Sequence, residues 1–318
     1  MEKPDSYDVI IIGAGIAGLT AGIYAARRGL RTLIISKDIG GQALIAKEIE
    51  NYPAVDKASG VELVQKAYEQ SQKFGAELII DEVKKVEKEH EGLFRIKVVN
   101  SEYLSKAVII ASGKIPQDLG VVGEDKFRGN GLSYCATCDA PLYKNKRVVV
   151  VGDGAYAYDA AILLSKYAAE VVLITRRKEL SGERELVEAI LKSQKIKVLY
   201  ETKVKGILGT FKVKSITLET SPNIEYNMPT DGLFVEMGYA IKVEPFKDLV
   251  DLDERKQVVI NNRNETSTSG VFAAGDVTNT PYKQFVISAS EGAKAALSAY
   301  EYIQRLAGKS AVAIDWHK

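Results

Sequence analysis

The chain has 318 residues, of which 46% are hydrophobic, and its formal net charge is +1. This length and apolar content suffice for two compact domains, each with its own core. The near balance of 43 basic and 42 acidic residues disfavours a nucleic-acid-binding platform, which usually carries a clear basic excess. The apolar run at residues 9–12 is far too short for a signal-peptide core or a membrane span. We therefore expect a cytoplasmic protein without membrane or nucleic-acid partners.

A glycine-rich turn opens the chain. A buried strand is expected at residues 7–12, and it runs directly into G-A-G-I-A-G at residues 13–18, before a helix at residues 19–28. In the G-x-G-x-x-G pattern the first glycine allows the tight turn, the second lets backbone approach a pyrophosphate, and the third lets the helix pack on the strand. The helix N-terminus also attracts the anion. A mere tight turn is the alternative, but the position between strand and helix favours a dinucleotide site.

The segment after this turn is less informative. A second strand is expected at residues 32–35, followed by Ser36 and Lys37 where a ribose-binding carboxylate is usual, with Asp38 slightly late. The ribose contact is therefore left open. The polar loops G-G-Q at residues 40–42 and E-N-Y-P at residues 50–53 are ordinary connections unless a cofactor lies beside them.

The pattern next predicts an amphipathic helix at residues 61–74 and a short antiparallel excursion at residues 76–99, with its turn at His90. A strand is expected at residues 107–111. The charged, glycine-rich stretch at residues 117–131 is the first predicted domain boundary.

Both cysteines of the chain, Cys135 and Cys138, lie in C-A-T-C-D at residues 135–139. A C-x-x-C pair can cycle between dithiol and disulfide, because one thiol has a pKa lowered toward neutrality. Asp139 is a candidate for handling the proton. Half a zinc site and two inert buried cysteines are the alternatives. No metal site is expected, since the two histidines, His90 and His317, are far away in sequence.

The opening pattern then repeats about 140 residues later. A strand at residues 147–151, G-D-G-A-Y-A at residues 152–157, a helix at 158–167 and a strand at 170–175 indicate a second nucleotide-type fold in the same chain. Further elements are expected as a helix at 183–193 and strands near 197–200, 204–208, 215–219 and 232–237.

The last part of the chain is predicted to return to the first fold near residues 243–247. Strands are expected at residues 258–260 and 271–274, and a final amphipathic helix at residues 288–306. Gly275 and Asp276 end the second of these strands, where a ligand-binding loop belongs in an open α/β sheet.

Together these motifs closely resemble the low-molecular-weight, bacterial/archaeal-type thioredoxin reductases, nearly from end to end. The resemblance rests on the glycine turn at 13–18, G-Q at 41–42, E-N-Y-P at 50–53, A-S-G at 111–113, C-A-T-C-D at 135–139, V-F-A-A-G-D-V at 271–277 and Y-K-Q at 282–284. It implies an α/β fold of two Rossmann-like, three-layer domains, the second inserted into the first. The FAD-binding domain would comprise residues 1–118 and 246–318, and a pyridine-nucleotide-type domain at residues 119–245 would carry the cysteines.

The resemblance also implies residue roles. Cys138 would face the flavin, Cys135 would attack the partner's disulfide, and Asp139 would protonate the flavin-side chemistry. The implied FAD site consists of Gly13, Gly15, Ala17, Gly18, Gly41, Gln42, Asn51, Ala111, Gly113, Gly275, Asp276, Lys283 and Gln284. The implied reaction is thioredoxin-disulfide reduction, with electrons passing from FAD through the cysteines to a thioredoxin-like or glutaredoxin-like protein. A homodimer is expected.

The inserted domain departs from the family at the site for NADPH, the usual electron donor. Members usually carry G-G-G-N/D-S-A and H-R-R-x-x-x-R, and these arginines hold the 2′-phosphate of NADPH. This chain has Asp153 and Tyr156 in the first motif, and Ser181 in place of the third arginine. The residues left as candidates for NADPH binding are Gly152, Gly154, Arg176 and Arg177.

Three functions therefore stay open. The first is the thioredoxin reductase just described. The second keeps FAD and disulfide but uses a donor other than NAD(P)H, or reverses the flow as an FAD-dependent dithiol oxidase. The third is a nucleotide-binding regulatory module with a vestigial redox pair. Larger glutathione-reductase-like enzymes are disfavoured, because they place their cysteines early in the FAD domain, where this chain has none.

Overall fold

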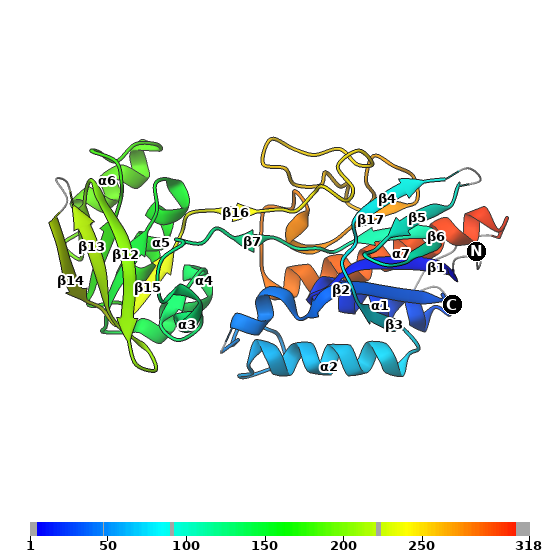
Figure 1. Cartoon of the computed structure of the whole chain (residues 1–318), viewed down its shortest axis with the longest axis horizontal. Coiled ribbons are helices and arrows are strands. Elements are labelled where there is room, and N and C mark those ends of the chain that lie inside the picture. The colour runs from blue at the N-terminus through cyan, green and yellow to red at the C-terminus, as the bar shows by residue number, and fades with distance from the viewer. Residues whose placement is uncertain (1–4, 47, 90–91, 221–223, 310–318) are drawn as a thin grey trace. The chain divides into compact units, whose positions relative to one another are not determined.

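The computed structural model describes residues 5–46, 48–89, 92–220 and 224–309. The chain forms two compact units: unit 1 comprises residues 1–115 and 241–318, and unit 2 comprises residues 116–240 (Figure 1). Unit 2 is thus a continuous segment inserted into a discontinuous one. The two crossings run through β7 (Ile115–Pro116) and β16 (Tyr239–Ala240), which pair with each other.

Among the described residues, unit 1 is built on a seven-stranded sheet of order β3-β2-β1-β6-β5-β4, with β17 paired to β6. The strands are β1 (Asp5–Ala14), β2 (Thr32–Ile39), β3 (Glu77–Ile80), β4 (Lys85–Lys88), β5 (Phe94–Lys97), β6 (Glu102–Ile110) and β17 (Val271–Ala273). All pairs are parallel except those of the β4–β5 hairpin and of β5 with β6. Val9, Ile10 and Ile11 of β1 are fully buried, as expected of a central parallel strand covered on both faces.

Helices α1 (Ile16–Arg27), α2 (Gly60–Lys73) and α7 (Phe285–Leu306) pack on one face of this sheet (Figure 1). Short 3₁₀ helices η1 (Gly41–Ile45) and η4 (Gly275–Val277) follow β2 and β17. A Cβ on Gly292 of α7 would lie 2.1 Å from the carbonyl oxygen of Ala17 in α1. Because no side chain fits there, α7 packs closely on α1 beside the glycine turn.

Unit 2 contains, in its described part, a five-stranded parallel sheet of order β11-β10-β9-β15-β8 and an antiparallel sheet of order β12-β13-β14. The strands are β8 (Leu132–Ser133), β9 (Arg147–Val151), β10 (Glu170–Ile174), β11 (Ile196–Leu199), β12 (Thr202–Gly209), β13 (Val213–Thr220), β14 (Ile224–Pro229) and β15 (Gly232–Val235). The helices are α3 (Glu124–Phe127), α4 (Ala136–Asp139), η3 (Ala140–Tyr143), α5 (Ala155–Ser165) and α6 (Arg184–Lys192). The core between α5 and the parallel sheet includes the fully buried Tyr158.

Both predicted strand–glycine turn–helix motifs are present, with element ends shifted by a few residues. The prediction of a strand at residues 258–260 is wrong. Val258 forms only isolated bridges, with Leu252 and Thr278. On either side, the carboxylate of Asp253 and the side-chain oxygen of Asn261 accept bonds from nearby backbone amides, which favours tight turns over a strand.

The antiparallel excursion predicted at residues 76–99 is partly wrong. β4 and β5 form the expected hairpin, but β3 pairs in parallel with β2. The reason is that α2 lies between β2 and β3, and a strand–helix–strand crossover produces parallel pairing. The turn predicted at His90 lies outside the described residues, and β14 was not predicted from the sequence.

Candidate functional site

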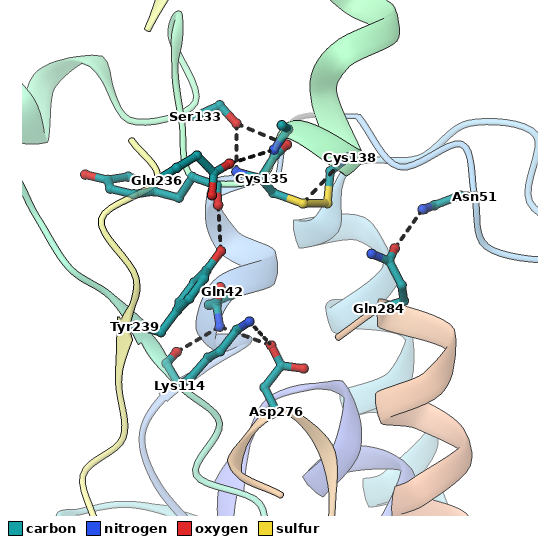
Figure 2. The surroundings of a disulfide bond; sticks show 12 residues. Gln42, Asn51, Lys114, Ser133, Cys135, Cys138, Glu236, Tyr239, Asp276 and Gln284 are labelled. Carbon is teal, nitrogen blue, oxygen red and sulfur yellow. Dashed lines mark hydrogen bonds and ion pairs between the residues drawn. A yellow bond between two sulfur atoms is a disulfide. The ribbon is translucent and has the colours of Figure 1, made fainter. Parts of the chain in front are cut away.

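Cys135 and Cys138 form a disulfide in unit 2, with their Cα atoms 5.3 Å apart. Cys135 is the N-cap of α4, and the backbone amide of Cys138 donates to Cys135 Sγ at 3.2 Å (Figure 2). Side chains three positions apart meet on one helical turn, so the C-x-x-C spacing lets the bond close without a long loop. Cys138 is exposed, and Cys135 is half-buried. The pair is therefore placed for disulfide exchange.

Two polar side chains hold the backbone at the start of α4. The amide of Cys135 donates to Ser133 Oγ at 3.1 Å, and the amide of Ala136 donates to Glu236 Oε1 at 3.2 Å (Figure 2). Glu236 comes directly after β15. This strand pairs with β8, which directly precedes the disulfide segment, so the sheet brings Glu236 close to the start of α4. Neither contact was predicted from the sequence, and the second could not be, because Glu236 lies 100 residues from Ala136.

Asp139 ends α4 next to Cys138. Burial raises the pKa of the Asp139 carboxyl above its usual value and outweighs the hydrogen bond with Ser133, which acts in the opposite direction. A raised pKa keeps the carboxyl protonated to a higher pH. Asp139 is thus suited to donating a proton beside the disulfide.

We expect Asp139→Asn to slow electron exchange between the flavin and the cysteine pair by about 100-fold, as the loss of a positioned acid typically does. Stopped-flow absorbance of the flavin during dithiol reduction measures this rate. The exposed carboxylate of Asp159, on α5 of the same unit, provides the control Asp159→Asn, which should keep the wild-type rate. A rate unaltered in Asp139→Asn at every pH would contradict the role.

The pH dependence of stability has a definite sign for this residue. Because the native pKa of Asp139 is raised, the stabilisation due to its proton is complete below the ordinary aspartate pKa and is lost as pH rises through the native pKa. Asp139→Asn should remove this contribution from the pH dependence of the unfolding free energy.

The glycine turn of unit 1 permits close backbone approach. Gly13 has φ 110°, and a Cβ there would lie 2.3 Å from the carbonyl oxygen of Ala111. A Cβ on Gly18 would lie 1.9 Å from the carbonyl oxygen of Gly13. The space beside Gly15, the N-cap of α1, is open by contrast. A Cβ added there would have only the carbonyl oxygen of Gly40 within reach, at 4.0 Å. The first turn of α1 has no acidic residue and no side-chain cap, so its amides fit a dinucleotide pyrophosphate.

A polar cluster in the same unit surrounds Asp276. Gln42 Nε2 donates to Lys114 O at 2.8 Å and to Asp276 Oδ2 at 3.5 Å, and Lys114 Nζ lies 3.7 Å from Asp276 Oδ2 (Figure 2). Ser288 Oγ donates to Asp276 Oδ1 at 3.2 Å. The structure thus brings together the predicted residues Gln42 and Asp276 and adds Lys114 and Ser288, which the sequence did not reveal.

Other predicted FAD residues also lie in unit 1. Asn51 Nδ2 donates to Gln284 Oε1 at 3.1 Å (Figure 2). Lys283 Nζ donates to the carbonyl oxygen of Thr278, and burial lowers the pKa of Lys283. The remaining predicted positions here are Ala17, which is buried, Gly41 and Gly113, which both have positive φ and open space at the Cβ position, and Gly275, which has φ 80°.

The late carboxylate of Asp38 has a local role. Asp38 Oδ1 accepts a hydrogen bond from the amide of Gly41 at 2.9 Å, which closes the turn between β2 and η1. Asp38 thus stabilises a turn, and this contact does not identify the residue that binds the ribose.

In the predicted NADPH site of unit 2, the Asp153 carboxylate links the glycine turn to the residues after β10. Asp153 Oδ1 accepts hydrogen bonds from Thr175 Oγ1 and, at 3.1 Å, from the amide of Arg176. Arg176 Nε also lies 3.8 Å from Asp153 Oδ2. Arg177 donates to the Ser181 hydroxyl. The predicted residues Gly152, Gly154, Arg176 and Arg177 therefore gather at one edge of the sheet, with Asp153 among them.

The chain matches the model of the pyridine nucleotide-disulphide oxidoreductase family over residues 7–296. The chain belongs to this family. It is 37% identical over 311 residues to a thioredoxin reductase of Bacillus subtilis, covering 96% of this chain and 98% of the relative. It is 38% identical over 303 residues to a thioredoxin reductase of Treponema pallidum, covering 94% and 98%. The crystal structure of thioredoxin reductase from Streptococcus pyogenes matches with a TM-score of 0.91 at 33% identity, over 95% of this chain and 100% of that one.

As a pyridine nucleotide-disulphide oxidoreductase, the protein is an FAD-dependent enzyme. The predicted resemblance, α/β fold with Rossmann-like units, oxidoreductase class and FAD cofactor are confirmed. Within the described ranges, no helix is long and apolar enough to cross a bilayer, and no three His, Cys, Asp or Glu side chains are grouped to hold a metal ion. The domain limits, the roles of single residues, the homodimer and the cytoplasmic location stay predictions.

Proposed function

We propose that the protein is a thioredoxin-disulfide reductase that reduces the disulfide of a thioredoxin-like or glutaredoxin-like protein through Cys135 and Cys138. The observation that carries the proposal is the disulfide on one partly exposed helical turn, in a chain whose relatives are thioredoxin reductases over nearly their full length. FAD supplies the electron pair when bound. The rest of the chemistry belongs to side chains of unit 2.

The cysteines exchange disulfides in two balanced steps. The Cys135 thiolate attacks one sulfur of the partner's disulfide, which forms a mixed disulfide and releases the other partner sulfur as a thiol after protonation. The Cys138 thiolate then attacks Cys135 Sγ, which restores the Cys135–Cys138 bond and releases the partner as a dithiol. Asp139, with its raised pKa, holds the proton needed when the pair is reduced again.

We assign FAD to unit 1 and the pyridine-nucleotide-type fold to unit 2. The glycine turn at Gly13, Gly15 and Gly18 would hold the pyrophosphate, since the Gly15 side is open and the α1 amides are uncapped. Asp276 would bind the ribityl chain from the end of β17. The flavin neighbourhood would be formed by Gln42, Asn51 and Gln284.

Reduction of the bound flavin by a dithiol tests the function. Under anaerobic conditions, reduced thioredoxin or dithiothreitol should bleach the flavin of the FAD-loaded protein, because disulfide exchange is reversible. In the forward direction, protein whose flavin has been reduced with dithionite should reduce oxidised thioredoxin stoichiometrically. Failure of both reactions would contradict the proposal.

A second candidate keeps FAD and the disulfide but uses a donor other than NADPH, or passes electrons from a dithiol to oxygen as an oxidase. The pairing of Arg176 with Asp153 favours it, because this arginine is expected to hold the 2′-phosphate of NADPH. Oxygen consumption sustained by a dithiol alone, at the rate of flavin turnover, would identify the oxidase.

A further inference from the structure

We infer that Asp153 sets the nucleotide specificity of unit 2: its carboxylate excludes the 2′-phosphate of NADPH and leaves a site for a dinucleotide with an unphosphorylated ribose, as in NADH. The inference rests on the proposed function for the use of this dinucleotide as electron donor. The binding preference itself depends only on residues of unit 2.

The turn after β9 keeps its glycines where backbone is crowded. A Cβ on Gly152 would lie 2.3 Å from the carbonyl oxygen of Glu236, so glycine is required there. Gly154 has φ 155° and is the N-cap of α5. The turn therefore has the geometry of a dinucleotide-binding turn, with one side chain, that of Asp153, between the two glycines.

The Asp153 carboxylate reaches the end of the neighbouring strand, β10. Its Oδ1 accepts from Thr175 Oγ1 and from the amide of Arg176, the two residues that follow Ile174 at the carboxyl end of β10. In dinucleotide-binding folds a carboxylate at the end of the second strand binds the ribose hydroxyls. In unit 2 the carboxylate comes instead from Asp153, in the turn after β9. Its Oδ2 makes the longer contact, 3.8 Å to Arg176 Nε, which a ribose hydroxyl can replace.

Two hollows meet at this carboxylate. One, of about 170 Å³, is lined mainly by strand-end residues that include Val151, Ile174 and Val204. The other, of about 250 Å³, lies at the N-terminus of α5 and includes Gly154 and Ala155. Asp153 and Arg176 line both hollows. The lining of the first is mixed, and its apolar side chains, among them Val151 and Ile174, offer contacts for a base. The second contains the N-terminus of α5, whose first turn has no acidic residue and can bind a pyrophosphate. Glu236, which accepts from the amide of Ala136, also lines this hollow.

The charges at this point oppose a 2′-phosphate. A dianionic phosphate placed on the ribose would meet the Asp153 carboxylate, which two hydrogen bonds hold in position. Arg176 Nε lies 3.8 Å from Asp153 Oδ2, so this carboxylate partly balances its charge, and Lys203, which lines the first hollow, is paired with Glu219. The guanidinium of Arg177 donates a hydrogen bond to the Ser181 hydroxyl. A 2′-hydroxyl, in contrast, can donate to the carboxylate, so the same group attracts one ligand and repels the other.

Equilibrium binding of the non-redox halves of the two donors tests the inference. Isothermal titration of the FAD-loaded protein with ADP-ribose and with 2′-phospho-ADP-ribose gives the ratio of their dissociation constants, and bound FAD keeps both probes out of its own site. The wild-type protein should bind ADP-ribose at least about tenfold more tightly. Asp153→Asn, which keeps the shape, and Asp153→Gly, which restores the family's glycine, should reduce or invert this preference.

Asp159→Asn is the matched control, because it removes the same charge from an exposed position on α5. It should keep the wild-type ratio. The inference is overturned if the wild type binds the 2′-phosphorylated probe equally well or better, if both Asp153 variants keep the wild-type preference, or if no protein binds either probe.

Dithiol bleaching of the flavin, measured on the same preparations, separates this inference from the proposed function. Bleaching should be equal in the wild type and in all three variants, since it uses the cysteine pair and no dinucleotide. Normal bleaching together with an unaltered binding ratio in the Asp153 variants overturns the specificity alone. An Asp153-dependent ratio without bleaching in the wild type overturns the disulfide reductase alone.

Discussion

Replacing either Cys135 or Cys138 with serine should lower kcat/KM for thioredoxin reduction by at least about 1000-fold, while the FAD content stays that of the wild type. The two sulfurs form a single disulfide, so the loss of either one removes the whole redox couple. Both lie in unit 2, whereas every proposed FAD residue lies in unit 1. FAD binding should therefore be unaffected.

The two cysteine variants should differ in their spectra. Cys135→Ser keeps Cys138, the proposed flavin-facing thiol, and should show a long-wavelength thiolate-to-flavin charge-transfer band. Cys138→Ser should lack it. Thr137→Ser, at an exposed position between the cysteines, is the control and should retain turnover. Equal loss of flavin from both cysteine variants would instead show that the pair is structural.

Gly13→Ala should prevent stable FAD binding and lower the unfolding free energy of unit 1 by about 2–5 kcal/mol. Two costs combine at this position. The residue has φ 110°, which an L-residue with a side chain rarely adopts, and its Cβ would lie 2.3 Å from the carbonyl oxygen of Ala111. Relief requires the backbone of the turn or of the loop after β6 to move, and both contain proposed FAD-binding residues.

Gly29→Ala separates these two costs. Gly29 follows α1 with φ 75°, but nothing lies within 4 Å of its Cβ position. Alanine there should cost about 1 kcal/mol and leave FAD bound. Denaturant unfolding and the flavin-to-protein absorbance ratio measure both effects. Similar losses in the two variants would mean that overlap with Ala111 is not the decisive cost.

Local sequence was sufficient to predict the parts of the site in which neighbours in the chain act together. The turn at Gly13 and Gly15 and the pair Cys135 and Cys138 are of this kind, because a tight turn or one helical turn brings the required atoms together. The partners Lys114, Ser288 and Glu236 could not be found this way. Each comes from a segment distant in sequence, and only the sheet order and the packing of α7 place it near its partner.

The donor site shows the same limit. Sequence alone showed Asp153 as a departure from the family's first motif and Arg176 as a candidate for NADPH binding, and it treated the two residues separately. Parallel pairing of β9 with β10 places the residues after these two strands side by side, so that the two side chains pair. Their pairing weakens the case for NADPH, which depended on an arginine available for the phosphate.

The insertion of unit 2 also delays the completion of unit 1 during synthesis. Unit 2 is continuous, so it can fold on the ribosome as soon as residues 116–240 have emerged. The first glycine turn, made earliest, must wait for β17 and α7, since β17 completes the pairing of β6 and Gly292 packs on Ala17. FAD capture therefore belongs to the last stage of the protein's maturation. A ribosome-stalled chain that ends before β17 should present a folded redox unit without its flavin.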